Sequence, residues 1–266
     1  MKRIFLFILV FGLYLSPVPA REESEKIFPA SEKPAGKIFL GEKITYQISY
    51  LGIPVGEAVM EVKEIAKIKE RNAYHVVVTA RSAPILEWIY PVMDEHHTYI
   101  DTERFHSLRY EKKINEGNYH THELMEYDQE KHLGEFYSYK DKSRKEMIIP
   151  PNVQDQISCG YWFRLQDVKP KTKLTMPVNA DEKNWDLDAV TYGVKQKKID
   201  GVGVFQAIEV EPVLMFEGFF MRRGKIRGWM SMDERRIPLV MKVNVPVLGS
   251  VKAVLTQYEP GQESTN

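Results

Sequence analysis

The sequence contains a single cysteine among 266 residues, so it cannot form an intramolecular disulfide. The same scarcity excludes zinc sites built from several thiolates. Its 37 basic and 37 acidic residues cancel, whereas a protein that binds nucleic acid usually carries a basic surface. We therefore expect no nucleic-acid partner. Hydrophobic residues make up 43% of the chain, which is typical of a globular protein with its own core.

The motifs of common catalytic and cofactor sites are also missing. No G-x-S-x-G, H-E-x-x-H or P-loop sequence occurs in the chain. Paired carboxylates that could hydrolyse a glycoside cannot be assigned, because their separation is a three-dimensional quantity. We therefore name no catalytic residue and no cofactor. We expect a protein that is not an enzyme, with a hydrolase kept as an alternative.

Only one long apolar run is present, and it stands at the N-terminus. A short basic start precedes the run Ile4–Leu15, and the small residues Val18 and Ala20 follow it. This order is typical of a secretory signal peptide, and twelve apolar residues are too few for a span, which takes about 20. We predict a cleaved signal over residues 1–20, a flexible leader over 21–37, and a mature chain that does not span a membrane.

From Glu42 onward, apolar and polar residues alternate with the period of a half-buried strand. Ile44, Tyr46 and Ile48 would share one face. The turn sequence around Gly52 then leads into a second alternating run, which predicts a hairpin. Further alternating runs cover Tyr74–Ala80, Leu108–Ile114, Tyr119–Tyr127, Leu133–Tyr139, Leu174–Val178, Val204–Val210, Ile226–Met232, Ile237–Val245 and Val251–Tyr258.

Two segments favour helices, Ala83–Tyr90 and Asp155–Gln166, because their apolar residues recur at helical spacing. So many strands with so few helices must protect their sheet edges, and a sheet does this by curling. The pattern predicts an all-β, mainly antiparallel fold. We expect a rolled barrel or a curved half-barrel with one or two short helices packed on it.

Three stretches together resemble the DUF3108 family of exported bacterial proteins of unknown function. They are the run Gly41–Tyr50 with Gly52–Gly56, the segment Asp155-Gln156-Ile157-Ser158 with Tyr161, Phe163 and Arg164, and the group Trp229, Asp233, Arg236 and Pro238. Cys159-Gly160 departs from the alanine-rich filler of that family's central helix. The resemblance implies a single β-rich domain, placed over residues 38–260, in the Gram-negative envelope. We therefore expect a periplasmic protein, and the resemblance implies no chemistry.

The histidines suggest a metal site, but their spacing does not favour one. His120 and His122 would share one face of a strand, as chelating pairs do. His96 and His97 are adjacent, so they would point to opposite faces of a strand. We therefore expect no bound metal.

The stripe Asp155, Ser158, Tyr161 and Arg164 is the candidate ligand-binding site. Residues three apart on a helix lie along one slowly drifting line. Arg164 could hold a phosphate or carboxylate in a bidentate grip, with the two hydroxyls adding hydrogen bonds. The alternative is structural: Asp155 caps the helix, Tyr161 packs, and Arg164 pairs with a carboxylate of the sheet.

Three function classes follow. The first is a non-enzymatic binding or carrier module for an apolar or amphiphilic ligand, such as a lipid or glycolipid. The second is a structural or assembly factor that binds another envelope protein, which requires an exposed sheet edge or apolar patch. The third is a hydrolase, which requires a cleft with convergent titratable groups.

Overall fold

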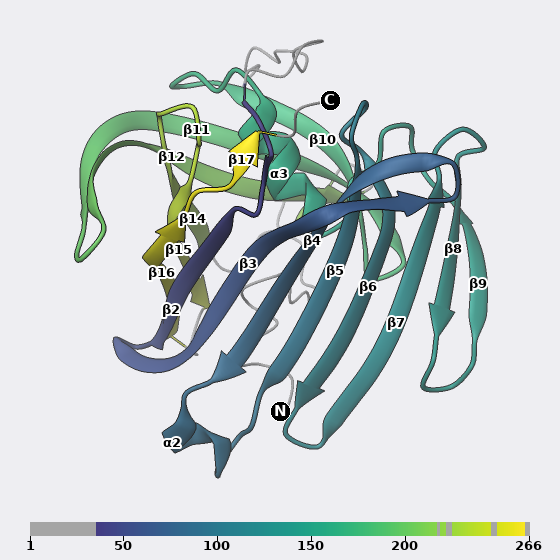
Figure 1. Cartoon of the computed structure of the whole chain (residues 1–266), viewed down its shortest axis with the longest axis horizontal. Coiled ribbons are helices and arrows are strands. Elements are labelled where there is room, and N and C mark those ends of the chain that lie inside the picture. Colours follow the sequence, from purple (N-terminus) through teal and green to yellow (C-terminus); the bar gives the residue numbers. More distant parts are fainter. Residues whose placement is uncertain (1–35, 217–218, 222–224, 246–248, 264–266) are drawn as a thin grey trace.

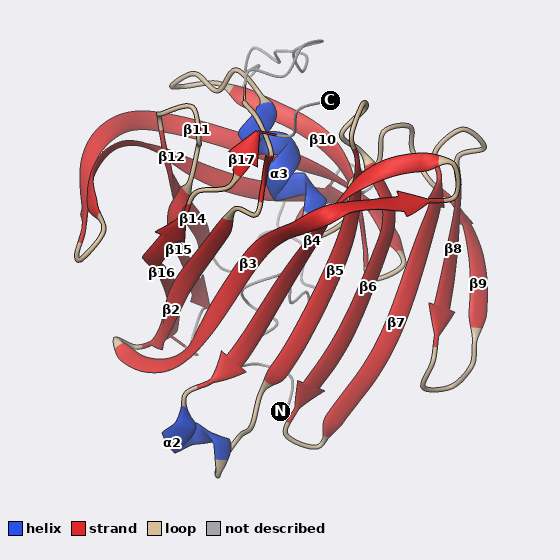
Figure 2. Cartoon of the chain, in the orientation of Figure 1, coloured by secondary structure: helices blue, strands red, loops and turns tan. Residues whose placement is uncertain are grey.

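The computed structural model describes residues 36–216, 219–221, 225–245 and 249–263. The predicted signal peptide, residues 1–20, lies outside these ranges, as does the predicted 21–37 leader except for its last two residues. Within the described ranges the chain is mostly strand, with two short helices (Figure 2). The all-β fold class is confirmed, and the domain boundaries 38–260 stay a prediction.

The first half of the sheet is a meander in which each strand pairs antiparallel with the next one along the chain. The predicted alternation explains its inner face: Ile44, Tyr46 and Ile48 are all buried. The strands are β2 (Lys43–Tyr50), β3 (Ile53–Ile68), β4 (Arg71–Ser82), β5 (Met93–Asp101), β6 (Ser107–Glu116), β7 (Tyr119–Asp128), β8 (Leu133–Ser138) and β9 (Arg144–Ile148).

The second half continues the same sheet, because its last strand pairs with β2. It comprises β10 (Lys173–Ala180), β11 (Lys183–Ile199), β12 (Gly203–Phe216), β14 (Lys225–Ser231), β15 (Pro238–Val245) and β16 (Gly249–Glu259), with β13 (Phe219–Met221) beside β12. A separate small pair joins β1 (Phe39–Leu40) to β17 (Gln262–Glu263). All these ladders are antiparallel, and the large sheet has 15 strands.

The sheet curls without closing. Its edge strands are β9 and β10, and no ladder joins them in the described part of the chain (Figure 1). The segment after β9 runs beside β10 instead. The backbone N–H of Gln154 donates to the backbone carbonyl of Pro177 at 2.9 Å, and the backbone N–H of Asn179 donates to the backbone carbonyl of Gln154 at 2.8 Å. We call the line between β9 and the β10–β11 turn (180–183) the seam. Of the two predicted shapes, the structure has the open half-barrel.

The helix α3 (Ser158–Leu165) lies between the two halves of the sheet, and its side chains pack in two of the core clusters (Figure 1). Tyr161 and Leu165 pack in a core cluster with inner residues of β3 to β7. Cys159 and Phe163 pack in a second cluster with β10, β11 and β12. α3 therefore buries residues on both sides, and Cys159 is an inert core residue because burial raises the pKa of its thiol to about 12.

The predicted hairpin at Gly52 is confirmed. Leu51 and Gly52 form a two-residue turn with φ values of 50° and 88°, and positive φ at both positions suits the twist of paired strands. The first predicted helix is shorter than expected: α2 covers only Pro84–Glu87, and none of its residues is buried. Ile85 of α2 is exposed to solvent, so of the one or two short helices expected to pack on the sheet, α3 is the one that packs in its core.

Candidate functional site

Asp155 and Ser158 cap the first turn of α3. Asp155 Oδ1 accepts the backbone N–H groups of Ile157 at 2.7 Å and Ser158 at 2.8 Å. In return, Ser158 Oγ accepts the backbone N–H of Asp155 at 2.8 Å. This reciprocal arrangement is a capping box, which satisfies amide groups that a helix N-terminus otherwise leaves without partners.

The second oxygen of Asp155 ties α3 to the sheet. Oδ2 accepts hydrogen bonds from the hydroxyls of Thr98 on β5 and Ser107 on β6. The carboxyl is fully buried, and burial raises its pKa while these hydrogen bonds oppose the rise. Asp155 therefore links the start of α3 to two strands of the first half of the sheet.

Arg164 lies in a buried ion pair at the other end of α3. Its Nη1 and Nη2 donate to the two carboxylate oxygens of Glu42, at 2.8 and 2.7 Å. Glu42 also accepts the hydroxyl of Tyr258 at 3.1 Å, and Arg164 Nη2 also donates to the Arg235 carbonyl at 2.9 Å. The side chains of Arg164 and Glu42 are 4% and 0% exposed. The pair joins α3 to the chain just before β2.

Tyr161 completes the predicted stripe, with its ring centre 5.0 Å from the guanidinium carbon of Arg164. The structure thus places Asp155 and Ser158 at one end of α3, Tyr161 and Arg164 towards the other, and all four are buried. Their contacts match the structural alternative: a cap, a packed ring and a carboxylate pair. The ligand-binding role of these residues stays a prediction.

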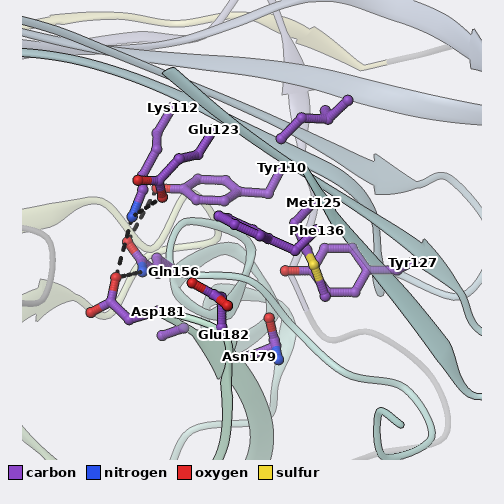
Figure 3. A pocket seen from close by; sticks show the side chains of 12 residues that line it. Tyr110, Lys112, Glu123, Met125, Tyr127, Phe136, Gln156, Asn179, Asp181 and Glu182 are labelled. Carbon is purple, nitrogen blue, oxygen red and sulfur yellow. Dashed lines mark hydrogen bonds and ion pairs between the residues drawn. The ribbon is translucent and has the colours of Figure 1, made fainter. Parts of the chain in front are cut away.

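A pocket opens at the seam, and Gln156, the residue that follows Asp155 of the stripe, lines it (Figure 3). One side is apolar and comes from β7 and β8, where Met125, Tyr127 and Phe136 stand together. The other side is polar and comes from β6, β7, β10, the residue after Asp155 and the β10–β11 turn. The lining is Tyr110, Lys112, Glu123, Leu124, Met125, Tyr127, Phe136, Gln156, Asn179, Ala180, Asp181 and Glu182.

Lys112 is the centre of the polar side. Its ammonium group pairs with Glu123 at 2.9 Å and with Asp181 at 3.2 Å. Gln156 extends the network, because its Nε2 donates to Asp181 at 3.5 Å and its Oε1 accepts the Tyr110 hydroxyl at 3.1 Å. These bonds connect β6 and β7 with the β10–β11 turn across the pocket, as the dashed lines in Figure 3 show.

The titratable groups of this network are poorly suited to proton transfer near neutral pH. Burial lowers the pKa of Lys112, but the charges of Asp181 and Glu123 outweigh it, so the pKa is raised. The imidazole of His96, within 2.6 Å of the Tyr110 hydroxyl, is buried, and burial with the nearby charge of Lys112 lowers its pKa to about 3. A general acid or base works best with a pKa near the working pH, and the pKa values of Lys112 and His96 both lie far from neutral pH.

Sequence patterns did not predict this pocket, because its polar side depends on Asp181. That residue belongs to a turn 69 positions from Lys112, and only the curl of the sheet brings the two together. Asp181 and Glu182 both have positive φ, 50° and 59°, at a turn where Asn-Gly is usual. The sequence shows only that Asn-Gly is replaced there, which does not identify Lys112 as the partner of Asp181.

The histidines considered as metal ligands lie on two faces of the sheet. His96 points inward, while His97 on the outer face is 2.9 Å from His75, as adjacent residues of a strand require. His122 contacts Glu111 at 2.6 Å and stacks on Tyr139. Among the described residues, no group of three or more His, Cys, Asp or Glu side chains is arranged to hold a metal ion.

Asp94 and Glu116 form a carboxyl pair at the strand ends next to α2. Both residues are 4% exposed, and the backbone N–H of Asn115 donates to Asp94 Oδ1 at 2.8 Å. The hydroxyl of Tyr90 lies 3.5 Å from Glu116 Oε2. Burial, followed by the charge of Asp94, raises the pKa of Glu116 to about 7, and burial also raises the pKa of Asp94.

We expect the Glu116 carboxyl to make the protein less stable as the pH rises from about 4.5 to about 7. Its pKa is higher in the folded state than its ordinary value of 4.5, so the folded protein binds more protons in that window. The free energy of unfolding then decreases with rising pH. Glu116→Gln should flatten this slope in urea unfolding at a series of pH values. Glu70→Gln, at a side chain that is 93% exposed, is the control, and an unchanged slope in Glu116→Gln would contradict the assignment.

Neither described helix is long and apolar enough to cross a bilayer. The chain is similar to several solved structures, of which three are described here. One is a β-barrel-like protein of a domain of unknown function, DUF1849, from Brucella abortus, with a TM-score of 0.57 and 9% identity over 84% of this chain and 98% of that chain. At such low identity the likeness shows a shared fold alone.

The two other structures have lower scores. They are a protein from Bacteroides fragilis described as exported with a YmcC-like fold, with a TM-score of 0.37 and 9% identity, and a protein from Parabacteroides distasonis described as a lipoprotein, with 0.35 and 7%. Each match covers 85% of this chain and 99% of the other. No curated protein matches the sequence. The model of the family described as a protein of unknown function, DUF3108, matches residues 45–256. The chain therefore belongs to the DUF3108 family.

Proposed function

We propose that the protein is a non-enzymatic binding module that holds an amphiphilic ligand, of the lipid or glycolipid class, at the seam pocket. One observation carries the proposal: the pocket has an apolar side with Met125 and Phe136, and a polar side with Lys112 and Gln156. Ligand sites combine an apolar lining with a few polar groups that fix orientation. The predicted signal peptide implies export, so we propose that the protein acts in the periplasm.

The size of the pocket limits how a ligand enters. The pocket is partly open to solvent and its volume is about 30 Å³, enough for a water molecule and too small for an acyl chain. An amphiphile therefore enters only if the seam widens. The seam is held by side-chain contacts: Lys145 pairs with Glu182 at 3.1 Å, and Asn184 Nδ2 donates to the Ile148 carbonyl at 2.8 Å. An exposed ion pair contributes only about 0–1 kcal/mol, so separating it costs less than breaking a ladder.

In this proposal the predicted stripe acts indirectly. Asp155 and Arg164 fix the two ends of α3, and Gln156 beside Asp155 then reaches into the pocket. The head group of the ligand contacts Lys112 and Gln156 in place of the Arg164 grip expected from the sequence. A hydrolase is less well supported than a binding module at this pocket, because Lys112 is held in ion pairs and the pKa of His96 is lowered, so neither group is tuned for proton transfer near neutral pH.

Cross-linking the seam tests the proposal. In Lys145→Cys/Glu182→Cys, a short bis-maleimide would tie β9 to the β10–β11 turn. The native Cys159 should not react, because it is buried and its thiol pKa is raised. We expect the unlinked variant to bind an environment-sensitive fluorescent fatty acid, and the linked variant to bind it at least roughly tenfold more weakly, a loss of about 1.4 kcal/mol.

The matched control is Lys43→Cys/Glu259→Cys, which places the same linker across β2 and β16. Those residues also form an exposed ion pair, at 3.7 Å, but they lie on a ladder that need not open. Linking there should leave probe binding unchanged. If the folded, unlinked protein binds no probe, the amphiphile proposal is wrong. If seam-linked and unlinked proteins bind equally, the ligand does not enter through the seam.

A further inference from the structure

Six exposed apolar side chains gather at one end of the half-barrel. They come from two chain connections at that end, the β2–β3 turn and the α2 loop, and the Ala83 amide joins the two by donating to the Val55 carbonyl at 2.8 Å. Figure 2 shows α2 projecting past the ends of β4 and β5. We call this group the apolar tip: Leu51, Ile53, Ile85, Trp88, Ile89 and Met93.

The exposure of the tip is not a by-product of core packing. Trp88 is 91% exposed, and Ile85 and Ile89 are each 78% exposed. α2 buries none of its own residues, so these side chains contribute little to folding. A single exposed apolar residue is normal, but a cluster that includes a tryptophan marks an interaction surface.

A row of basic residues lies on the outer face of the sheet near the same end. Arg227 on β14 pairs in register with Lys242 on β15, and Lys242 pairs with Lys252 on β16. Like charges directly opposite each other on neighbouring strands destabilise a sheet. Arg227 contacts Glu209, whereas in the described part of the chain no carboxylate lies within ion-pair distance of Lys242 or Lys252.

The strand β11 adds further positive charge to this row. Burial lowers the pKa of Lys197, and the charges of Lys252 and Lys195 lower it further, while Glu209 opposes them. The Lys197 ammonium group lies over the ring of Trp229, 3.9 Å from its centre. The basic row is Lys195, Lys197, Arg227, Lys242 and Lys252, and two acidic residues lie near it: Glu209, which pairs with Arg227, and Glu211, which accepts the hydroxyl of Tyr192. On the neighbouring strands Glu57 stands opposite Arg81, so those two charges balance.

Register places the row close behind the tip. Lys252 pairs with Ser49, two residues before Leu51, and Lys242 lies three residues before the end of β15. With a rise of about 3.4 Å per residue, Lys242 and Lys252 stand roughly 7–10 Å back from the strand ends. Lys252 is exposed while its neighbours Val251 and Ala253 are buried, so Lys252 faces solvent.

We propose that this end of the protein docks on a lipid bilayer that contains anionic phospholipid. The apolar tip would lie in the interface, where tryptophan is favoured and where apolar groups of peripheral proteins reach about 5–10 Å deep. The basic row would then stand at the level of the phosphates, at the distance that its register gives it. This surface is separate from the seam pocket, so it does not depend on the amphiphile proposal.

Vesicle flotation tests the docking. The folded wild-type protein should float with phosphatidylcholine vesicles that contain phosphatidylglycerol, and more weakly with phosphatidylcholine alone. Each lysine near an anionic surface contributes about 1 kcal/mol, so Lys242→Gln/Lys252→Gln should weaken binding to the anionic vesicles by roughly tenfold or more. The control Lys67→Gln/Lys69→Gln changes two exposed lysines at the β3–β4 turn, at the opposite end of the sheet, and should bind as wild type.

The tip itself is tested by Ile85→Ser/Trp88→Ser against Ile148→Ser. Ile148 is 79% exposed on β9, at the opposite end of the sheet. The tip variant should lose vesicle binding with both lipid compositions, while Ile148→Ser keeps it. The tryptophan emission of the wild type should also shift to shorter wavelength when vesicles are added, and that of the variant without Trp88 should not. Absence of flotation by the folded wild type, or equal flotation by the two serine variants, would overturn the proposal and favour a protein partner for the tip. Equal binding with and without phosphatidylglycerol would show that the basic row does not contribute to docking.

Discussion

Replacing Arg164 by methionine is expected to lower the free energy of unfolding by about 3–5 kcal/mol, because it leaves the Glu42 carboxylate buried without its partner. The side chain of Glu42 is 0% exposed, so water cannot replace the two hydrogen bonds that Arg164 donates. The hydroxyl of Tyr258 would remain as a neutral partner of Glu42. Urea unfolding of wild type and variant measures the loss.

The matched control is the double variant Glu42→Met/Arg164→Met, which removes both charges. Replacing a buried ion pair by apolar residues is often neutral, so most of the lost stability should return. Equal stability of the single and double variants would show that the pair is not the source of the loss. A single variant as stable as wild type would mean that Arg164 is free in solution, which is the condition for the ligand grip predicted from the sequence.

Asp155→Ala should be the second most damaging substitution, with a loss of about 2–4 kcal/mol. It removes the cap of α3, which contributes about 1 kcal/mol, and leaves the buried hydroxyls of Thr98 and Ser107 without their acceptor. Ser158→Ala removes only the reciprocal half of the capping box, so it should cost about 1 kcal/mol. The ratio of the two losses in urea unfolding is the informative result. Equal losses would show that the link to β5 and β6 contributes nothing.

The alternation of apolar residues was sufficient to predict most strands, including β2, β7 and β16, and the hairpin at Gly52. It failed for β5, where the inward residues include Asp94, His96 and Thr98. These polar groups are buried because partners from other segments satisfy them, such as Asp155 for Thr98. β9 was also missed, because its exposed charged residues give no apolar period. A pattern of hydrophobicity cannot reveal a buried face that is polar.

The candidate site was predictable only in part. The spacing of Asp155, Ser158, Tyr161 and Arg164 placed them on one helix, and a capping role for Asp155 was foreseen as an alternative. The partner of Arg164, however, is Glu42, 122 residues earlier in the chain, and no local pattern identifies such a pair. The seam pocket depends in the same way on the curl that brings Asp181 to Lys112. Tertiary topology, not local sequence, creates both features.

Native mass spectrometry of the protein purified gently from cell envelopes tests the binding proposal most directly. The proposal predicts a folded species heavier than the mature polypeptide by the mass of one amphiphile, which is released on mild activation. It also predicts that delipidated protein regains such a mass when lipid is added, and that the seam-linked Lys145→Cys/Glu182→Cys variant does not. A folded protein that shows only its polypeptide mass, both as purified and after lipid is added, would contradict the proposal.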